Sequence, residues 1–174
     1  MNMEINPSEY KILIVDDVMS NVLLLKVLLT NEKFNIVTAS NGNQALDQVK
    51  KENPDLILLD VMMPGENGID TAREIRRYDT AVQIIFVTSS SEFAVQSYVV
   101  GAYYYQLKPI WKDSFFRLTD AVLAECRKRT QHSLILRCKT GISRIDLDQL
   151  LYCEVLGRTL LFHLVDGTVL ESTG

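Results

Sequence analysis

The chain of 174 residues is long enough for one complete domain with a hydrophobic core and part of a second domain. Its formal net charge of −4 at pH 7 argues against a surface built throughout to bind nucleic acid or an anionic membrane. The sequence has no signal-peptide core at its start and no apolar run near the roughly 18 residues that a spanning helix needs. We therefore expect a cytoplasmic protein without membrane contact.

Apolar segments alternate with amphipathic segments over residues 11–129. The apolar segments are predicted as five strands: Lys11–Val15, Asn35–Ala39, Leu56–Leu59, Gln83–Val87 and Ala102–Leu107. Between and after them, apolar residues recur three and four positions apart, which predicts helices. This alternation predicts an α/β fold with a five-stranded parallel, doubly wound (flavodoxin-like) sheet that is covered on both faces.

The pattern changes after residue 130 to short strands rich in leucine and β-branched residues. The segment "LGR" and the pair Asp166-Gly167 are turn signals between these strands. We predict one domain over residues 8–129, followed at 130–174 by a linker and a short all-β segment. The 42 residues from Ser133 are too few to bury a core unaided, so their strand edges should pair with the first domain or with another copy of the chain.

The cysteines and histidines do not suggest a metal site. The three cysteines, Cys126, Cys138 and Cys153, are odd in number and lack a CxxC spacing, which fits reduced thiols. His132 and His163 are the only histidines. A site built from thiolate and imidazole ligands is therefore not expected.

Chemically active residues follow four of the predicted strands. Asp16 and Asp17 end the first strand, Asp60 the third, Thr88 the fourth and Lys108 the fifth. Because the carboxyl ends of parallel strands share one edge of the sheet, these side chains should meet in one crevice. Three carboxylates there would repel one another unless a cation were present, and hard oxygen ligands suit Mg²⁺.

Such a crevice could transfer phosphoryl groups. Asp60 could act as a nucleophile toward phosphorus, while Thr88 and Lys108 contact phosphoryl oxygens. Each residue also has an ordinary explanation, as a helix cap, a structural threonine or a solvated lysine. Their coincidence at the ends of four strands favours the site over those separate explanations.

The segments "ILIVDD", "LILLDVMMPGENGID", "IIFVTSSSE" and "YYYQLKPI" resemble the receiver domain of two-component response regulators, over roughly residues 10–129. The resemblance implies that Asp60 is the phosphoacceptor. It also implies that Asp16, Asp17 and Asp60 bind Mg²⁺ together with the backbone carbonyl of Met62. A histidine kinase would supply the phosphoryl group, and the phosphorylated receiver would form a homodimer.

The resemblance further implies a switch made by Thr88 and Tyr105, in which the hydroxyl moves toward the phosphoryl group and the aromatic ring turns inward. Lys108 matches the lysine of the family, with a cis peptide bond before Pro109, and the small Ser89 fits the position that admits the phosphodonor. Such a protein phosphorylates itself from a donor and slowly loses the phosphoryl group, so it is a regulator and not a turnover enzyme.

A second family with aspartyl-phosphate chemistry, the haloacid-dehalogenase-type phosphatases, is set aside. These enzymes need a second aspartate two residues after a nucleophile on the first strand. Here Val18 follows Asp16 at that offset, and Met19 follows Asp17.

The segments "IDLDQLLYCEVLGR" and "HLVDGTV" resemble the opening of a LytTR-type DNA-binding domain, which implies control of transcription. Residues 133–174 hold four basic and five acidic side chains, so DNA contact is expected from a complete output domain and not from these residues alone. The basic run 127–129 fits a helix C-terminus, with a phosphate contact as the alternative. The alternative output is a phosphorylation-dependent protein-interaction module without DNA binding.

Overall fold

The computed structural model describes residues 6–65, 67–130, 133–138 and 141–173. The side chains of residues 128–130 and 173 lie outside this description, and so does the prediction made for most of the basic run 127–129. The elements, in chain order, are η1 (Pro7–Glu9), β1 (Lys11–Val15), α1 (Met19–Asn31), β2 (Asn35–Ala39), α2 (Gly42–Glu52), β3 (Leu56–Leu59), α3 (Gly68–Arg76), β4 (Gln83–Thr88), α4 (Ala94–Val99), β5 (Tyr104–Leu107), α5 (Lys112–Thr130), β6 (Ser133–Cys138), β7 (Gly141–Asp146), η2 (Leu147–Gln149), β8 (Leu150–Leu156), β9 (Thr159–Leu164) and β10 (Val169–Thr173).

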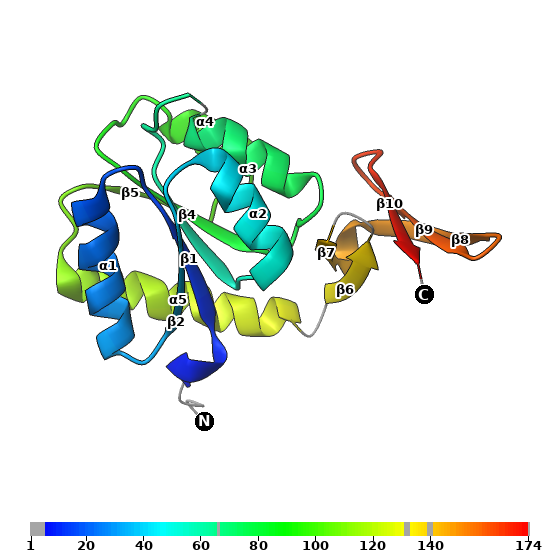
Figure 1. Ribbon diagram of the computed structural model, residues 1–174, viewed down its shortest axis with the longest axis horizontal. Helices are drawn as coiled ribbons and strands as arrows, with labels where there is room; N and C mark the ends of the chain where they lie inside the picture. Colours follow the sequence, from blue (N-terminus) through cyan, green and yellow to red (C-terminus); the bar gives the residue numbers. More distant parts are fainter. Residues whose placement is uncertain (1–5, 66, 131–132, 139–140, 174) are drawn as a thin grey trace.

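The first sheet is parallel and has the strand order β2-β1-β3-β4-β5, which confirms the predicted doubly wound fold. The chain moves outward from β1 to β2 and then crosses to β3, β4 and β5. Because parallel crossovers are right-handed, this reversal places helices on both faces of the sheet. Figure 1 shows the sheet between these helices, with α5 running along it toward the second part of the chain.

The core consists of two apolar layers, one on each face of this sheet. In β1, Ile12 and Ile14 pack in the layer with α1 and α5, while Leu13 and Val15 pack in the layer with α2 and α3. Strands β3 and β4 alternate in the same way. Burial on both faces explains why these strands read as continuous apolar runs in the sequence.

Two strand boundaries differ from the prediction. β4 is one residue longer than expected, because Thr88 still pairs with Leu107 of β5. β5 begins at Tyr104, two residues later than expected, because the N–H of Ala102 donates to the carbonyl of Ser97 (3.0 Å) at the end of α4. The apolar letters continue through this turn, so the sequence pattern alone extends the strand too far.

The second sheet is antiparallel, with the order β7-β6-β10-β9-β8. Gly157 (φ +65°) and Gly167 (φ +85°) lie in the predicted turns on either side of β9, in a left-handed conformation that glycine adopts without strain. The small core of this sheet is formed by Leu136, Ile145, Phe162 and Leu164. We call residues 133–173 the tail.

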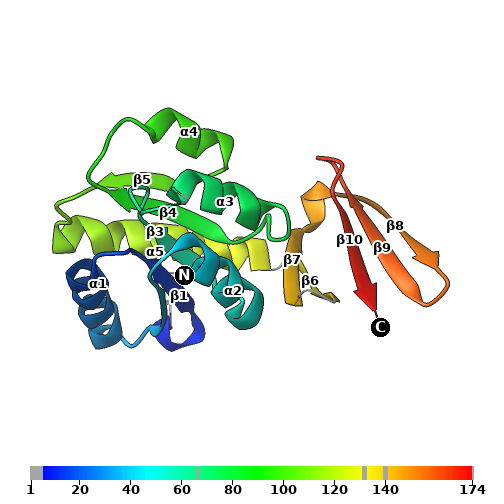
Figure 2. The same ribbon diagram turned by 45° about the horizontal axis from the view of Figure 1, so that its top comes forward.

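The tail lies beyond the end of α5, beside α2 and α3, and β7 is the strand nearest to the first domain (Figures 1 and 2). An isolated parallel bridge joins Arg144 of β7 to Asp79 in the α3–β4 loop. One tail edge therefore pairs with the first domain, as the short length of this segment led us to expect. Among the described residues, no helix combines the length and apolar character needed to cross a membrane.

Candidate functional site

The predicted acidic crevice is present at the carboxyl edge of the parallel sheet. Carboxylate oxygens of Asp16, Asp17 and Asp60 lie within 4.8 Å of one another. Asp16 and Asp60 are buried, whereas Asp17 is exposed at the rim. Two buried carboxylates this close to a third would repel one another strongly without a compensating positive charge.

Lys108 supplies such a charge from the end of β5. Its Nζ lies 2.8 Å from Asp16 Oδ2 and 2.8 Å from Asp60 Oδ2. Burial lowers the pKa of Lys108, but the hydrogen bonds and charges of both aspartates outweigh burial, and the pKa is raised above its ordinary value. The ammonium therefore remains charged and holds the ends of β1 and β3 together. The peptide bond between Lys108 and Pro109 is cis, as the resemblance implies.

Backbone and amide donors orient the two buried carboxylates. Asp16 Oδ1 accepts from the N–H of Val18 (2.8 Å), and the amide of Asn21 in α1 donates to both Asp16 oxygens (3.2 and 3.0 Å). Asp60 Oδ1 accepts from the N–H of Met62 (3.1 Å). The sequence does not predict that Asn21 binds Asp16, because a polar residue in the first turn of a helix is equally compatible with exposure to solvent.

Gly68, the first residue of α3, also supports the site and was not predicted. A Cβ at this position would lie 2.1 Å from the carbonyl oxygen of Asp60, and the N–H of Gly68 donates to the carbonyl of Val61 (2.9 Å). Only glycine lets α3 begin this close to the end of β3. The segment "GENG", which follows "VMMP", indicates a glycine-rich connection in the sequence. It does not indicate which residue Gly68 contacts.

Thr88 and Tyr105 lie on neighbouring strands beside the crevice. Thr88 is fully buried at the end of β4, and its Oγ1 accepts from the N–H of Ser90 at a long 3.4 Å. The Tyr105 hydroxyl donates to the carbonyl of Ser90 (2.6 Å), and its ring lies 6.0 Å from the ring of Phe86 between centroids. Burial, and to a lesser extent the charge of Asp60, raises the pKa of Tyr105.

The donor set fits a hard divalent cation. Each of the three aspartates offers a carboxylate oxygen, which is the ligand type that Mg²⁺ prefers. Met62, whose carbonyl was predicted as a further ligand, follows Asp60 by two residues. Its backbone N–H donates a hydrogen bond to the Asp60 carboxylate. Asp16, Asp17 and Asp60 are therefore the residues that would hold the ion.

The doubly wound sheet carries an aspartate cluster and a lysine at its carboxyl edge, which is the arrangement expected of a receiver domain. The chain belongs to the response regulator receiver domain family, since the model of that family matches residues 12–120. It is therefore the receiver domain of a two-component response regulator, followed by the tail.

Two curated relatives are similar to different shares of the chain. The sensory transduction protein LytT of Oceanobacillus iheyensis is 31% identical over 142 residues, which cover 78% of this chain and 58% of LytT. The transcriptional regulatory protein ZraR of Escherichia coli K12 is 37% identical over 115 residues, which cover 65% of this chain and 26% of ZraR. The chain thus spans less than two thirds of the length of either relative.

Solved structures agree on the fold. The response regulator TrrA of Thermotoga maritima, in complex with Mg²⁺ and BeF, is 34% identical with a TM-score of 0.61, covering 65% of this chain and 98% of TrrA. A CheY-like receiver domain protein of Methanospirillum hungatei is 26% identical with a TM-score of 0.66, covering 68% of this chain and 97% of that protein. Both similarities are confined to about two thirds of this chain and cover nearly all of the solved protein.

Proposed function

We propose that Asp60 accepts a phosphoryl group from a histidine kinase and that the modified receiver controls a LytTR-type output domain to which the tail belongs. The observation that carries this proposal is that Asp16 and Asp60 both form ion pairs with the ammonium of Lys108, while Asp17 lies at the rim of the crevice. An aspartate in this setting has a nucleophilic oxygen, a cation beside it and two further carboxylates with which it could bind a divalent ion.

In the proposed transfer, an Asp60 oxygen forms a bond to phosphorus while the bond between phosphorus and the phosphohistidine nitrogen breaks. The leaving imidazole keeps the electron pair of that bond and takes up a proton. Met62 N–H and Lys108 fix the direction of the Asp60 carboxylate before the donor arrives. Lys108 and the hydroxyl of Thr88 then contact oxygens of the transferred group.

Mg²⁺ bound by Asp16, Asp17 and Asp60 would neutralise the charge of the phosphoryl oxygens. It would also reduce the electrostatic repulsion between the three aspartates and the negatively charged phosphodonor. The TrrA structure, which holds Mg²⁺ and BeF, supports this assignment because that protein has the same fold. The predicted carbonyl ligand of Met62 belongs to the same proposal. Reduced cysteines are typical of the cytoplasm, where we place the reaction.

The proposed switch moves Thr88 toward the phosphoryl group. This movement removes its contact with Ser90, the residue whose carbonyl also accepts from Tyr105. In the proposed switch Ser90 then shifts, the bond between its carbonyl and the Tyr105 hydroxyl breaks, and the Tyr105 ring turns inward toward the space that Thr88 leaves. Exposed apolar side chains on the neighbouring α4, including Val95, Tyr98 and Val99, suit a homodimer of the phosphorylated form.

The output that we propose is LytTR-type DNA binding. It is supported by the match to LytT, which covers 78% of this chain and is therefore longer than the family match over residues 12–120. Binding should weaken steeply as salt concentration rises, because phosphate contacts release counterions. Salt-dependent DNA binding by the whole gene product tests this output, and binding to a protein partner without DNA binding favours the alternative interaction module.

The phosphoacceptor is tested by labelling with a small-molecule phosphodonor. We expect Mg²⁺-dependent incorporation of one phosphoryl group by the wild type and by Asp70→Asn, a control at an exposed aspartate of α3. Asp60→Asn should incorporate none, because an amide cannot form the acyl phosphate. Equal labelling of Asp60→Asn and the control would refute the assignment.

A further inference from the structure

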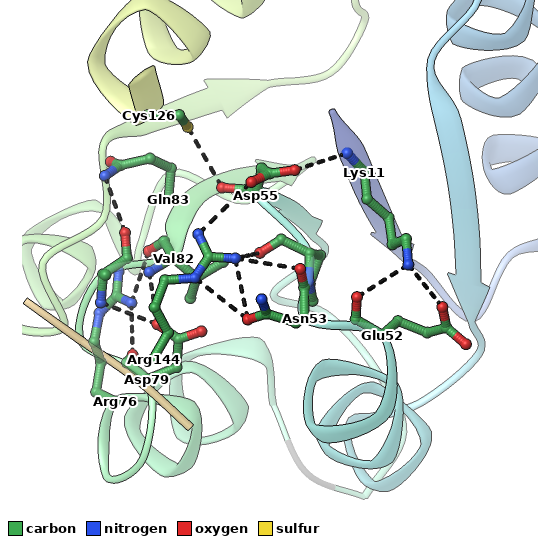
Figure 3. Close-up of polar contacts among 12 residues, drawn as sticks. Lys11, Glu52, Asn53, Asp55, Arg76, Asp79, Val82, Gln83, Cys126 and Arg144 are labelled. Carbon is green, nitrogen blue, oxygen red and sulfur yellow. Dashed lines mark hydrogen bonds and ion pairs between the residues drawn. The ribbon is translucent and has the colours of Figure 1, made fainter. Parts of the chain in front are cut away.

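The side chain of Arg144 in β7 extends from the tail into the first domain. Arg144 is only 6% exposed. An arginine is rarely buried to this extent unless nearby groups compensate its charge. Figure 3 shows the guanidinium beyond the end of α2, directed toward Asn53 and Asp55. This location lies at the start of β3, one strand length from Asp60 at the other end of that strand.

Three nitrogens of the guanidinium face acceptors. Nη2 donates to the carbonyl of Pro54 (2.9 Å), to the carbonyl of Asn53 (3.2 Å) and to Asn53 Oδ1 (3.1 Å). Nε also donates to Asn53 Oδ1 (3.3 Å), and Nη1 lies 3.7 Å from Asp55 Oδ1. A flat fork of donors fits this spread of acceptors, whereas the single nitrogen of a lysine would reach only part of it.

The acceptors are fixed by the first domain. Asn53 caps the C-terminus of α2 in a left-handed conformation (φ 48°), so the carbonyls of Asn53 and Pro54 lie just beyond the negative end of the helix dipole. Asp55 Oδ2 accepts from the N–H of Lys11 (2.8 Å), and the carbonyl of Asp55 accepts from the N–H of Gln83 (3.2 Å). A site held in this way needs little rearrangement to bind a cation.

A buried carboxyl group, that of Asp79, belongs to the segment of the first domain that pairs with the backbone of Arg144. Asp79 Oδ1 accepts from the N–H groups of Ala81 (3.0 Å) and Val82 (2.8 Å), which hold it in place. Burial raises the pKa of Asp79, and the charge of Arg144 is the strongest effect opposing that rise. The first domain thus offers the guanidinium three acceptors from Asn53 and Pro54 and the carboxylate of Asp55, with the carboxylate of Asp79 as a further electrostatic influence.

The other contacts between the tail and the first domain include the close packing of Gly141 against Lys50 of α2 and two hydrogen bonds. The N–H of Thr80 donates to the carbonyl of Arg144 (3.2 Å), and the N–H of Asp146 donates to Thr80 Oγ1 (3.2 Å). Beside these bonds lies a cleft of about 520 Å³, which is lined by Arg76 and Thr80 of the first domain and by Asp146 and Asp166 of the tail. Arg144 is therefore the largest buried polar anchor that the tail offers to the first domain in the described part of the chain.

We propose that the end of α2 and the start of β3 form a guanidinium-binding site, and that Arg144 occupies this site to dock the tail on the receiver. This guanidinium-binding site is separate from the acidic crevice that contains Asp60. Losing Arg144 should therefore release the tail without preventing phosphorylation of Asp60.

Hydrogen exchange of backbone amides in the full chain tests the docking. In Arg144→Lys the amides of Thr80 and Asp146, which bond across the interface, should exchange roughly tenfold faster or more, because hydrogen bonds to charged groups are lost. Arg158→Lys, at an exposed arginine in the β8–β9 turn, should exchange at the wild-type rate. Amides of β3 and labelling of Asp60 should be unchanged in both variants, which shows that the receiver is intact.

Two further variants exclude an effect on tail folding alone. Asn53→Gly keeps the left-handed turn but removes the side-chain acceptor, so it should accelerate the same amides with the tail sequence unaltered. In Arg144→Ala, millimolar methylguanidinium should restore protection and methylammonium should not. Wild-type exchange in Arg144→Lys, equal acceleration in Arg158→Lys, or no rescue by methylguanidinium would each overturn the proposal.

Discussion

Lys108 is the residue on which the acidic crevice depends before any metal binds. Its two 2.8 Å bonds offset the repulsion between Asp16 and Asp60, and its side chain is 18% exposed. Replacing it by Met leaves two buried carboxylates without their partner. We expect Lys108→Met to lower the free energy of unfolding without Mg²⁺ by about 2–3 kcal/mol, less than for a fully buried pair.

Mg²⁺ can replace the missing charge, so it should stabilise Lys108→Met more than the wild type. Urea unfolding with and without millimolar Mg²⁺ measures both effects. Lys26→Met, at an exposed position of α1, serves as the control and should show neither. Equal Mg²⁺ responses in Lys108→Met and the wild type would contradict the role given to Lys108.

At the scale of elements, the β3–α3 connection brings the helix against Asp60, the proposed phosphoacceptor. Gly68→Ala would place a methyl group 2.1 Å from the carbonyl oxygen of Asp60, so either the helix or the end of β3 must move. We expect a loss of about 3 kcal/mol in unfolding free energy and slower labelling of Asp60, since overpacking forces backbone shifts.

The control for Gly68→Ala is Gly157→Ala in the β8–β9 turn, where an added Cβ meets nothing within 4 Å. There only the left-handed conformation opposes alanine, at about 1–2 kcal/mol, and labelling of Asp60 should be unchanged. Normal labelling and stability in Gly68→Ala would show that α3 adjusts freely.

The strand ends were predictable because buried parallel strands appear as apolar runs, and the polar residue that ends each run marks the edge of the sheet. Asp16, Asp60, Thr88 and Lys108 follow from that rule. The start of β5 does not follow from it, because the turn before Tyr104 is also apolar. Asn21 and Gly68 act through contacts whose partners the local pattern does not specify.

At the scale of the whole molecule, docking of the tail could not be predicted in detail. The bonds of Arg144 to Asn53 join residues 91 positions apart, and an arginine within an alternating strand reads as a solvated side chain. The sequence indicated only that the tail was short and that its edges would need partners. The choice of β7 as the docked edge depends on the carbonyls at the end of α2.

The assembly of the phosphorylated form is predicted from the exposed apolar face of α4. With a beryllofluoride mimic, the wild type should dimerise in sedimentation velocity. Val99→Glu should weaken the dimer roughly tenfold or more, because a charge would be buried at the interface. Val27→Glu, at an exposed valine of α1, should dimerise normally; equal dimerisation of Val99→Glu would exclude this face.

The central claim is that Asp60 carries the phosphoryl group, and mapping of the modified residue tests it most directly. Borohydride reduces an acyl phosphate of aspartate to homoserine, which peptide mass spectrometry locates without relying on any variant. After treatment with a phosphodonor and Mg²⁺, we predict homoserine at position 60 and at no other aspartate. Homoserine at Asp16 or Asp17 with Asp60 unmodified, or a borohydride-resistant phosphate on a serine or threonine, would contradict the account.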